Sequence, residues 1–257
     1  MSDRPLILLA NDDGVSAHGL RALHQALEPI AQVYVVAPER EHSGRSHAIT
    51  LRHPLRVRKV SECVFATDGT PVDCVYVALH SKDLLPRRPD LVVSGINHGA
   101  NLGTDIFYSG TVAAAREGAL RGIPSLAFSS LNLAYLEEAS RTARDIVAQT
   151  LQQAKPGGHA VLINVNFPAT RAKGLRLSRL GERLYKDEVT VRKDPRGTKY
   201  YWVGGPGALH QPSEGTDTDA VDAGFASLTP LSLEATQDKH FDFASSLVQN
   251  TFAKETS

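Results

Sequence analysis

Short apolar runs alternate with segments of helical periodicity along the first two-thirds of the chain. The apolar runs predict strands at residues 6–10, 32–38, 90–95, 124–130 and 160–168. The segments between them predict helices at residues 20–30, 69–83, 110–122 and 135–154. Strands without polar alternation are typical of parallel sheets that helices cover on both faces. The fold class expected for the first 170 residues is therefore α/β, with a mostly parallel sheet.

Local signals refine this picture. Thr70 and Pro71 are residue types expected at the N-cap and in the first turn of a helix. Gly122 is expected to end the helix before it, because glycine readily adopts the left-handed backbone of a helix C-terminus. Residues 55–60 and 63–69 could pair as a hairpin.

The pattern changes after about residue 170. Short strands with polar alternation are predicted within residues 174–181, 187–194 and 198–205. A helical tail is predicted near residues 239–253. We interpret residues 1–257 as one domain, in which residues 171–257 add an antiparallel extension, an arm and a C-terminal helix to the core.

Polar residues gather in three loops that each follow a predicted strand. These loops are residues 11–14, 38–50 and 94–111. In an open α/β sheet, ligands bind outside the carboxyl ends of the strands. The three loops are therefore expected to meet at one rim of the sheet.

Two adjacent carboxylates, Asp12 and Asp13, end the first strand. One aspartate there would be read as a turn residue or a helix cap. Two side by side repel each other, and no basic residue stands next to them. A hard divalent cation such as Mg²⁺ or Mn²⁺ would relieve that repulsion, since both ions prefer oxygen ligands. The sequence favours a metal site over a simple turn.

The second loop, residues 38–50, is rich in hydroxyls and small residues. Alone it would be read as a mobile surface loop, and its charge run from Glu39 to His42 as a solvated one. Beside the two acids, the Ser43 hydroxyl becomes a candidate third oxygen ligand.

The third loop is long, and long loops in compact domains are usually functional. It contains Asn97 and Asn101 and runs into Ser109, Gly110 and Thr111, which open a helix. Backbone N–H groups at a helix N-terminus form a ready anion site, although a plain N-cap has the same local sequence. Neither a Walker loop nor a dinucleotide fingerprint is present. In the same loop, His98 and Asp105 could each act as an acid or base, but both are read as surface polar residues.

Composition narrows the classes of function. Lysine plus arginine equals aspartate plus glutamate at 28 each, which gives no electrostatic reason to expect a nucleic-acid or membrane partner. Cys63 and Cys74 match no disulfide framework or zinc pattern, so buried free thiols are expected. No apolar stretch is long enough for a signal peptide or a membrane span. A cytoplasmic protein is the resulting expectation.

A metal site and an anion site on one rim indicate phosphoryl chemistry. A cation can polarise a phosphoryl oxygen and lower the pKa of a water that attacks in line. Amide and backbone N–H groups can stabilise the developing charge. Nothing in these loops requires a covalent nucleophile.

The loop motifs resemble those of the SurE (survival protein E) family of nucleotidases. The resemblance rests on LLANDDG at residues 8–14, SG at 43–44, GTPVDCV at 69–75, SGINHGANLGTDIFYSGTVAAAREG at 94–118 and GTDTDAV at 215–221. It implies a metal-dependent phosphatase acting on nucleoside 5′- and 3′-monophosphates, and in some members on short polyphosphate. It further implies a Rossmann-like three-layer core with a C-terminal β-hairpin and an arm exchanged between subunits, giving a homodimer or homotetramer.

The family's functional residues carry over by motif. The implied ligands of one divalent cation per subunit are Asp12, Asp13, Ser43 and Asn97, and the catalytic residues among them are Asp12, Asp13 and Asn97. The implied phosphate contacts are Asn101, Ser109, Gly110 and Thr111. No role is assigned to His98 or Ser46.

Two other functions suit the same loops. A binding module could hold a metal–nucleotide complex without turning it over. A metal hydrolase for another bond, such as an amide, would usually add histidine ligands. The histidines near the loops are not at the spacing of a helical zinc motif, and they are His18, His42, His47 and His98.

Overall fold

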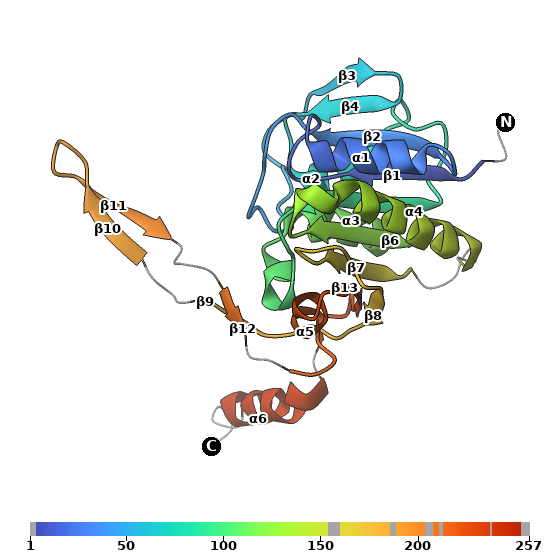
Figure 1. Cartoon of the computed structure of the whole chain (residues 1–257). Coiled ribbons are helices and arrows are strands. Elements are labelled where there is room, and N and C mark those ends of the chain that lie inside the picture. The colour runs from blue at the N-terminus through green and yellow to red at the C-terminus, as the bar shows by residue number, and fades with distance from the viewer. Residues whose placement is uncertain are drawn as a thin grey trace.

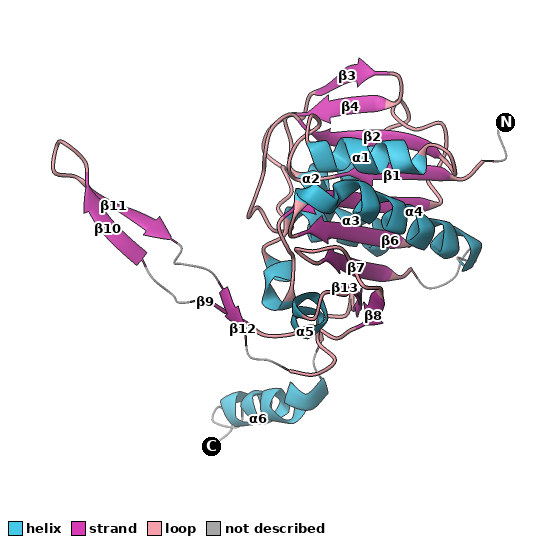
Figure 2. Ribbon diagram, viewed as in Figure 1, coloured by secondary structure: helices cyan, strands magenta, loops and turns pink. Residues whose placement is uncertain are grey.

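A nine-stranded sheet with helices on both faces forms the centre of the molecule (Figure 2). The computed structural model describes residues 4–153, 160–185, 189–203, 208–210, 213–236 and 238–252. The strand order is β3-β4-β2-β1-β5-β6-β7-β13-β8. The six strands β4, β2, β1, β5, β6 and β7 run parallel, whereas β3 is antiparallel to β4 and β13 is antiparallel to β7.

The elements have the following bounds. The sheet contains β1 (Leu6–Ala10), β2 (Gln32–Pro38), β3 (Val57–Ser61), β4 (Val64–Thr67), β5 (Leu91–His98), β6 (Ser125–Ser130), β7 (Leu162–Phe167), β8 (Leu175–Leu177) and β13 (Ala226–Leu231). Outside it lie β9 (Arg183–Tyr185), β10 (Val189–Lys193), β11 (Lys199–Val203) and β12 (Ala208–His210). The α-helices are α1 (His18–Leu27), α2 (Pro71–His80), α3 (Gly110–Leu120), α4 (Leu136–Gln153), α5 (Asp217–Asp222) and α6 (Phe241–Phe252). Short 3₁₀ helices span Gly103–Phe107, Leu133–Tyr135 and Asp238–His240.

The period of two along β1 divides the core into two layers. Ile7 and Leu9 pack with α1 and α4 on one face, and Leu8 and Ala10 pack with α2 and α3 on the other. All five residues of β1 are buried, as its unbroken apolar run predicts. This confirms the α/β three-layer prediction.

Most predicted elements form, and two differences matter. The helix expected over 20–30 ends at Leu27, so Ile30 lies beyond it. The strand expected over 90–95 continues to His98, because backbone pairing with β6 resumes after a register shift past Ser94. Asn97 therefore stands on the end of a strand rather than in a free loop.

The predicted cap of α2 and the predicted hairpin are confirmed, and the prediction for the two cysteines is corrected. Thr70 caps α2, and Asp73 completes a reciprocal capping box with it. Residues in β3 and β4 pair as the expected hairpin. Cys74 is buried as a free thiol, whereas Cys63 is only half-buried, which corrects the expectation that both are buried.

The region after residue 170 does not lie entirely outside the core. Strands β8 and β13 join the main sheet, and β8 runs parallel to β13, which corrects a purely antiparallel reading. Strands β10 and β11 form a hairpin that projects away from the sheet, and α6 also lies apart from it (Figure 1). Some end positions of the predicted elements lie outside the described residues. They are residue 154 of the helix expected over 135–154, residues 187–188 and 204–205 of two expected strands, and residue 253 of the expected helical tail. Among the described helices, none has both the length and the hydropathy needed to span a membrane.

Candidate active site

The three polar loops meet at the carboxyl ends of β2, β1 and β5, which are neighbours in the sheet. The backbone N–H of His42 donates to the carbonyl of Asp12 over 2.8 Å. The backbone N–H of His98 donates to Oδ2 of Asp13 over 3.2 Å. The hydroxyl of Thr111 donates to Oδ1 of Asp12. The second and third loops therefore both contact the acids of the first loop, as the sequence predicts.

Asp12 is buried against the start of α3 and is only 5% exposed. Gly110 makes this approach possible, since a Cβ there would lie 2.8 Å from the Asp12 Cβ and 2.9 Å from its Oδ2. Any other residue at position 110 would displace the carboxylate. The need for glycine here is a close approach, because Gly110 is the first residue of a regular helix.

The buried carboxylate of Asp12 has an unusual titration. The pKa of Asp12 is raised from 3.8 to about 6. Burial is the largest cause, the Thr111 hydrogen bond opposes the rise, and the charge of Asp13 adds to it. No lysine or arginine among the described residues forms an ion pair with Asp12 or Asp13. Within the described part of the chain, the site therefore holds negative charge that no lysine or arginine neutralises.

Asp13 is half-buried and turns toward β5. Burial raises its pKa, and the N–H group of His98 opposes that shift by stabilising the charged form. The charge of Glu41 raises the pKa further. Glu41 also accepts a 2.6 Å hydrogen bond from the Ser43 hydroxyl. Glu41 is exposed, as its reading as part of a solvated charge run predicts, although its charge still acts on Asp13.

The other two candidate metal ligands lie on the flanking loops. Ser43 is exposed, and it follows His42, whose N–H group joins this loop to Asp12. Asn97 is half-buried, and its side-chain amide donates to the carbonyl of Gly99 over 2.8 Å. That bond leaves the amide oxygen of Asn97 as its acceptor group.

Three of the four candidate phosphate contacts form the N-terminus of α3. Ser109 is the N-cap, and its hydroxyl accepts a 3.0 Å hydrogen bond from the N–H of Val112. Gly110 and Thr111 begin the helix, where backbone N–H groups lack intrahelical partners. Both readings of this segment, helix cap and anion site, fit the structure.

Asn101 is held by side chains that the sequence analysis did not select. Asn166 accepts from the Asn101 N–H over 2.8 Å and donates to its carbonyl over 3.0 Å. Asn164 donates to the same carbonyl, and Ser129 accepts from the Asn101 side chain over 2.7 Å. The sequence held one signal for these contacts, since Asn164 and Asn166 interrupt the otherwise apolar strand predicted over residues 160–168. Buried amides need hydrogen-bond partners.

Several known proteins resemble this chain in sequence and in fold. Residues 7–187 match the family described as Survival protein SurE. A protein of Sorangium cellulosum named 5′-nucleotidase SurE is 52% identical over 240 residues, covering 92% of this chain and 93% of its own. This chain belongs to the SurE family. A SurE-named 5′-nucleotidase of Myxococcus xanthus is 48% identical, with 92% and 91% of the two chains covered. The crystal structure of the SurE protein from Aquifex aeolicus superposes with a TM-score of 0.81 at 41% identity, covering 95% of this chain and 99% of that one.

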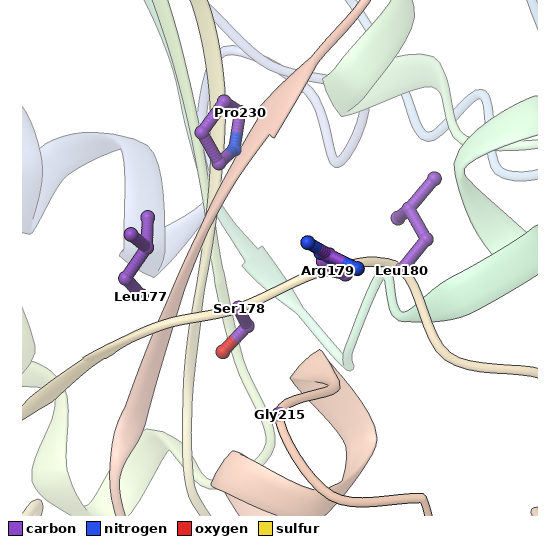
Figure 3. A pocket seen from close by; sticks show the side chains of 6 residues that line it. All are labelled: Leu177, Ser178, Arg179, Leu180, Gly215 and Pro230. Atoms are coloured by element: carbon purple, nitrogen blue, oxygen red, sulfur yellow. The ribbon is translucent and has the colours of Figure 1, made fainter.

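This SurE-family chain also has a hollow of about 470 Å³, whose lining residues differ from those at the rim (Figure 3). It is lined by Leu177, Ser178, Arg179, Leu180, Gly215 and Pro230. It lies by β8 and β13, and three strands separate β13 from β1 in the sheet. Since its lining contains no carboxylate or side-chain amide, it lacks the oxygen ligands that the rim supplies.

Proposed function

We propose that the chain hydrolyses nucleoside monophosphates to nucleoside and phosphate, using a divalent cation. The observation that carries the proposal is the pair of adjacent acids, which have no lysine or arginine partner among the described residues and contact a helix N-terminus. The relatives named 5′-nucleotidase SurE support the substrate class. The 5′-monophosphates are the principal proposed substrates, with 3′-monophosphates and short polyphosphate as further ones.

The proposed cation ligands are Asp12, Asp13, Ser43 and Asn97, with one cation per subunit. They offer carboxylate, hydroxyl and amide oxygens, which suit Mg²⁺ or Mn²⁺ and leave room for coordinated waters. No cluster of three or more His, Cys, Asp and Glu side chains suited to a metal occurs in the described part of the chain. The proposed ligand set contains no histidine or cysteine, and this all-oxygen composition favours a hard cation over zinc.

The proposed phosphate contacts are Asn101, Ser109, Gly110 and Thr111. A phosphate at the N-terminus of α3 would meet backbone N–H groups of the first turn that lack intrahelical partners, and the positive end of the helix dipole. Thr111 lies between the two subsites, because its hydroxyl contacts Asp12. It can therefore keep the carboxylate in place beside the substrate.

The proposed chemistry is an in-line attack by water on phosphorus, in which the new P–O bond forms as the ester P–O bond breaks and the nucleoside leaves with the proton that the water loses. When bound, the cation supplies Lewis-acid polarisation of a phosphoryl oxygen and lowers the pKa of a water. The N–H group of Gly110 stabilises negative charge that develops on the phosphoryl oxygens, while the N–H group of Thr111 bonds the Asp12 carboxylate. The acids Asp12, Asp13 and the amide of Asn97 act by holding that cation and orienting the water.

Purified protein is expected to release phosphate from 5′-AMP when Mn²⁺ or Mg²⁺ is present and to stop when a chelator is added. Restoring either cation in excess should restore the rate. The same assay with 3′-AMP and short polyphosphate measures the wider substrate range. Absence of metal-dependent release from a full set of nucleoside monophosphates would contradict the proposal. Saturable AMP binding without product would instead favour the binding module.

We further propose that the chain forms a homodimer or homotetramer through its C-terminal arm, with a cytoplasmic location. One face of the β10–β11 hairpin presents Val189, Val191, Tyr201 and Val203, which are 52–86% exposed. Solvent-exposed apolar faces of this kind usually mark an interaction site.

Light scattering is expected to give the mass of a dimer or tetramer for the wild type. The double variant V191K/Y201K should shift that mass toward the monomer, because both substitutions charge the same face. The control T190K alters the opposite face and should leave the mass unchanged. A wild type that stays monomeric throughout a concentration series would exclude the proposed assembly.

A further inference from the structure

Asp217 is a fully buried carboxylate outside the proposed chemistry. It lies in the GTDTDAV motif, directly after the N-cap Thr216 and at the start of α5. A buried carboxylate is costly unless hydrogen bonds satisfy it. Its partners therefore indicate what the motif does.

The two oxygens of Asp217 join three segments of the chain. Oδ2 accepts from the N–H of Gly103 over 2.9 Å. Oδ1 accepts from the N–H of Gly181 over 2.8 Å and from that of Thr218 over 2.9 Å. Gly103 lies in the loop between β5 and α3, and Gly181 lies just before β9. A single side chain thus links the active-site loop to the C-terminal region.

These segments pack too closely for larger residues. A Cβ on Gly103 would lie 2.5 Å from the carbonyl oxygen of Gly181, and Gly103 also has a φ of +51°. A Cβ on Gly181 would lie 2.4 Å from the hydroxyl of Thr218. A second link lies two residues further along both segments, where Arg183 forms a 2.7 Å ion pair with Asp105.

The anchored loop separates the candidate phosphate contacts. Asn101 precedes Gly103 by two residues, and the 3₁₀ helix Gly103–Phe107 leads to Ser109. The N–H groups of Tyr108 and Ser109 both bond the carbonyl of Asp105, over 2.9 and 3.1 Å. Gly103 and Asp105 therefore lie on the segment that joins Asn101, which Asn166 holds, to the N-terminus of α3.

We propose that Asp217, together with Arg183, is a positioning residue that holds the loop of residues 101–109 in the geometry that binds phosphate. The role rests on the proposed function, because it concerns the phosphate contacts of that site. A carboxylate is required because both oxygens accept hydrogen bonds. An asparagine would turn its NH₂ group toward the N–H of Gly103 or Gly181.

The variant D217N is expected to raise the KM for 5′-AMP and the dissociation constant of inorganic phosphate by about tenfold. Calorimetric titration with Mn²⁺ should give an affinity within about twofold of wild type, since the acids and Asn97 are untouched. The matched control D219N changes a partly exposed acid on the same helix and should alter none of these constants.

A purely structural role would reduce the folded fraction and the apparent kcat, with KM and phosphate affinity unchanged. Folded D217N with wild-type phosphate affinity would overturn the proposal. If D217N does not fold, R183M tests the same anchoring at its second link and should weaken phosphate binding several-fold, and unchanged binding there would also overturn it. Because phosphate titration needs no turnover, it reads the loop geometry separately from the proposed hydrolysis.

Discussion

Replacing Asp12 with asparagine is expected to remove metal-dependent hydrolysis and, at the same time, to stabilise the metal-free protein at neutral pH. The loss of rate should exceed about a hundredfold, because a charged cation ligand becomes neutral. The gain in stability follows from burial, since the asparagine oxygen can still accept the Thr111 hydrogen bond without a buried charge. A variant that is both inactive and more stable is typical of a functional site rather than of a structural one.

The pH dependence gives the sign of this effect. The pKa of Asp12 is about 6 in the folded protein, against 3.8 for an unperturbed aspartate. Its protonated form is thus favoured by folding, so its contribution to stability is full below pH 3.8 and is lost as pH rises through about 6. The shift corresponds to roughly 3 kcal/mol at higher pH. Protons also compete with the cation, so cation affinity should fall as pH drops below about 6.

Urea unfolding of the metal-free proteins across pH 4 to 8 measures this directly. Wild type should lose free energy of unfolding between about pH 4 and 6 relative to D12N, and D12N should be the more stable of the two at neutral pH. The control D145N changes an exposed aspartate and should follow wild type. A D12N protein that is active, or that is less stable than wild type at neutral pH, would refute the assignment.

Replacing Gly110 with alanine is expected to weaken cation binding by about ten- to a hundredfold. In most helices this change adds stability, because alanine is the better helix former. Here the new methyl group would lie 2.8 Å from the Asp12 Cβ and 2.9 Å from its Oδ2, and would displace the carboxylate. Titration of the metal-free protein with Mn²⁺ measures the affinity, and phosphate release from 5′-AMP measures the consequence.

The variant G118A separates this effect from a general disturbance of α3. A Cβ on Gly118 would also clash, at 2.7 Å from the Val92 Cβ and 2.6 Å from the Ser125 hydroxyl, but it lies in the core. We expect G118A to lower the melting temperature while its folded fraction binds Mn²⁺ normally. Equal cation affinities in G110A and wild type would show that Asp12 does not serve as a ligand.

Several features of the fold could be predicted because they depend on nearby residues. The buried run of β1, the Thr70 cap of α2 and the glycine after α3 are each specified within a few positions. Local patterns fix them because backbone hydrogen bonding and side-chain periodicity act over one or two turns. The meeting of three loops followed from one more rule, that parallel strands end at the same edge of the sheet.

Contacts between distant segments could not be predicted from those patterns. Asn166 holds Asn101 across 65 positions, and Asp217 holds Gly103 across 114. A buried asparagine in an apolar strand signals that a partner is needed, but the sequence does not show which one, because each partner is a backbone group that any residue could supply. Strand β13 likewise enters the core sheet only because it finds β7 as its antiparallel neighbour.

The sequence by itself determined the α/β class, the strand that carries Asp12 and Asp13, and the family, since these are written in local periodicity and contiguous motifs. Only the tertiary structure decided how the two acids differ. Asp12 turns under the N-terminus of α3 and is buried there, whereas Asp13 turns toward His98 and stays half-exposed. Neighbouring residues on an extended chain point to opposite sides, so the elements that pack beside each one set its burial, its hydrogen bonds and its pKa.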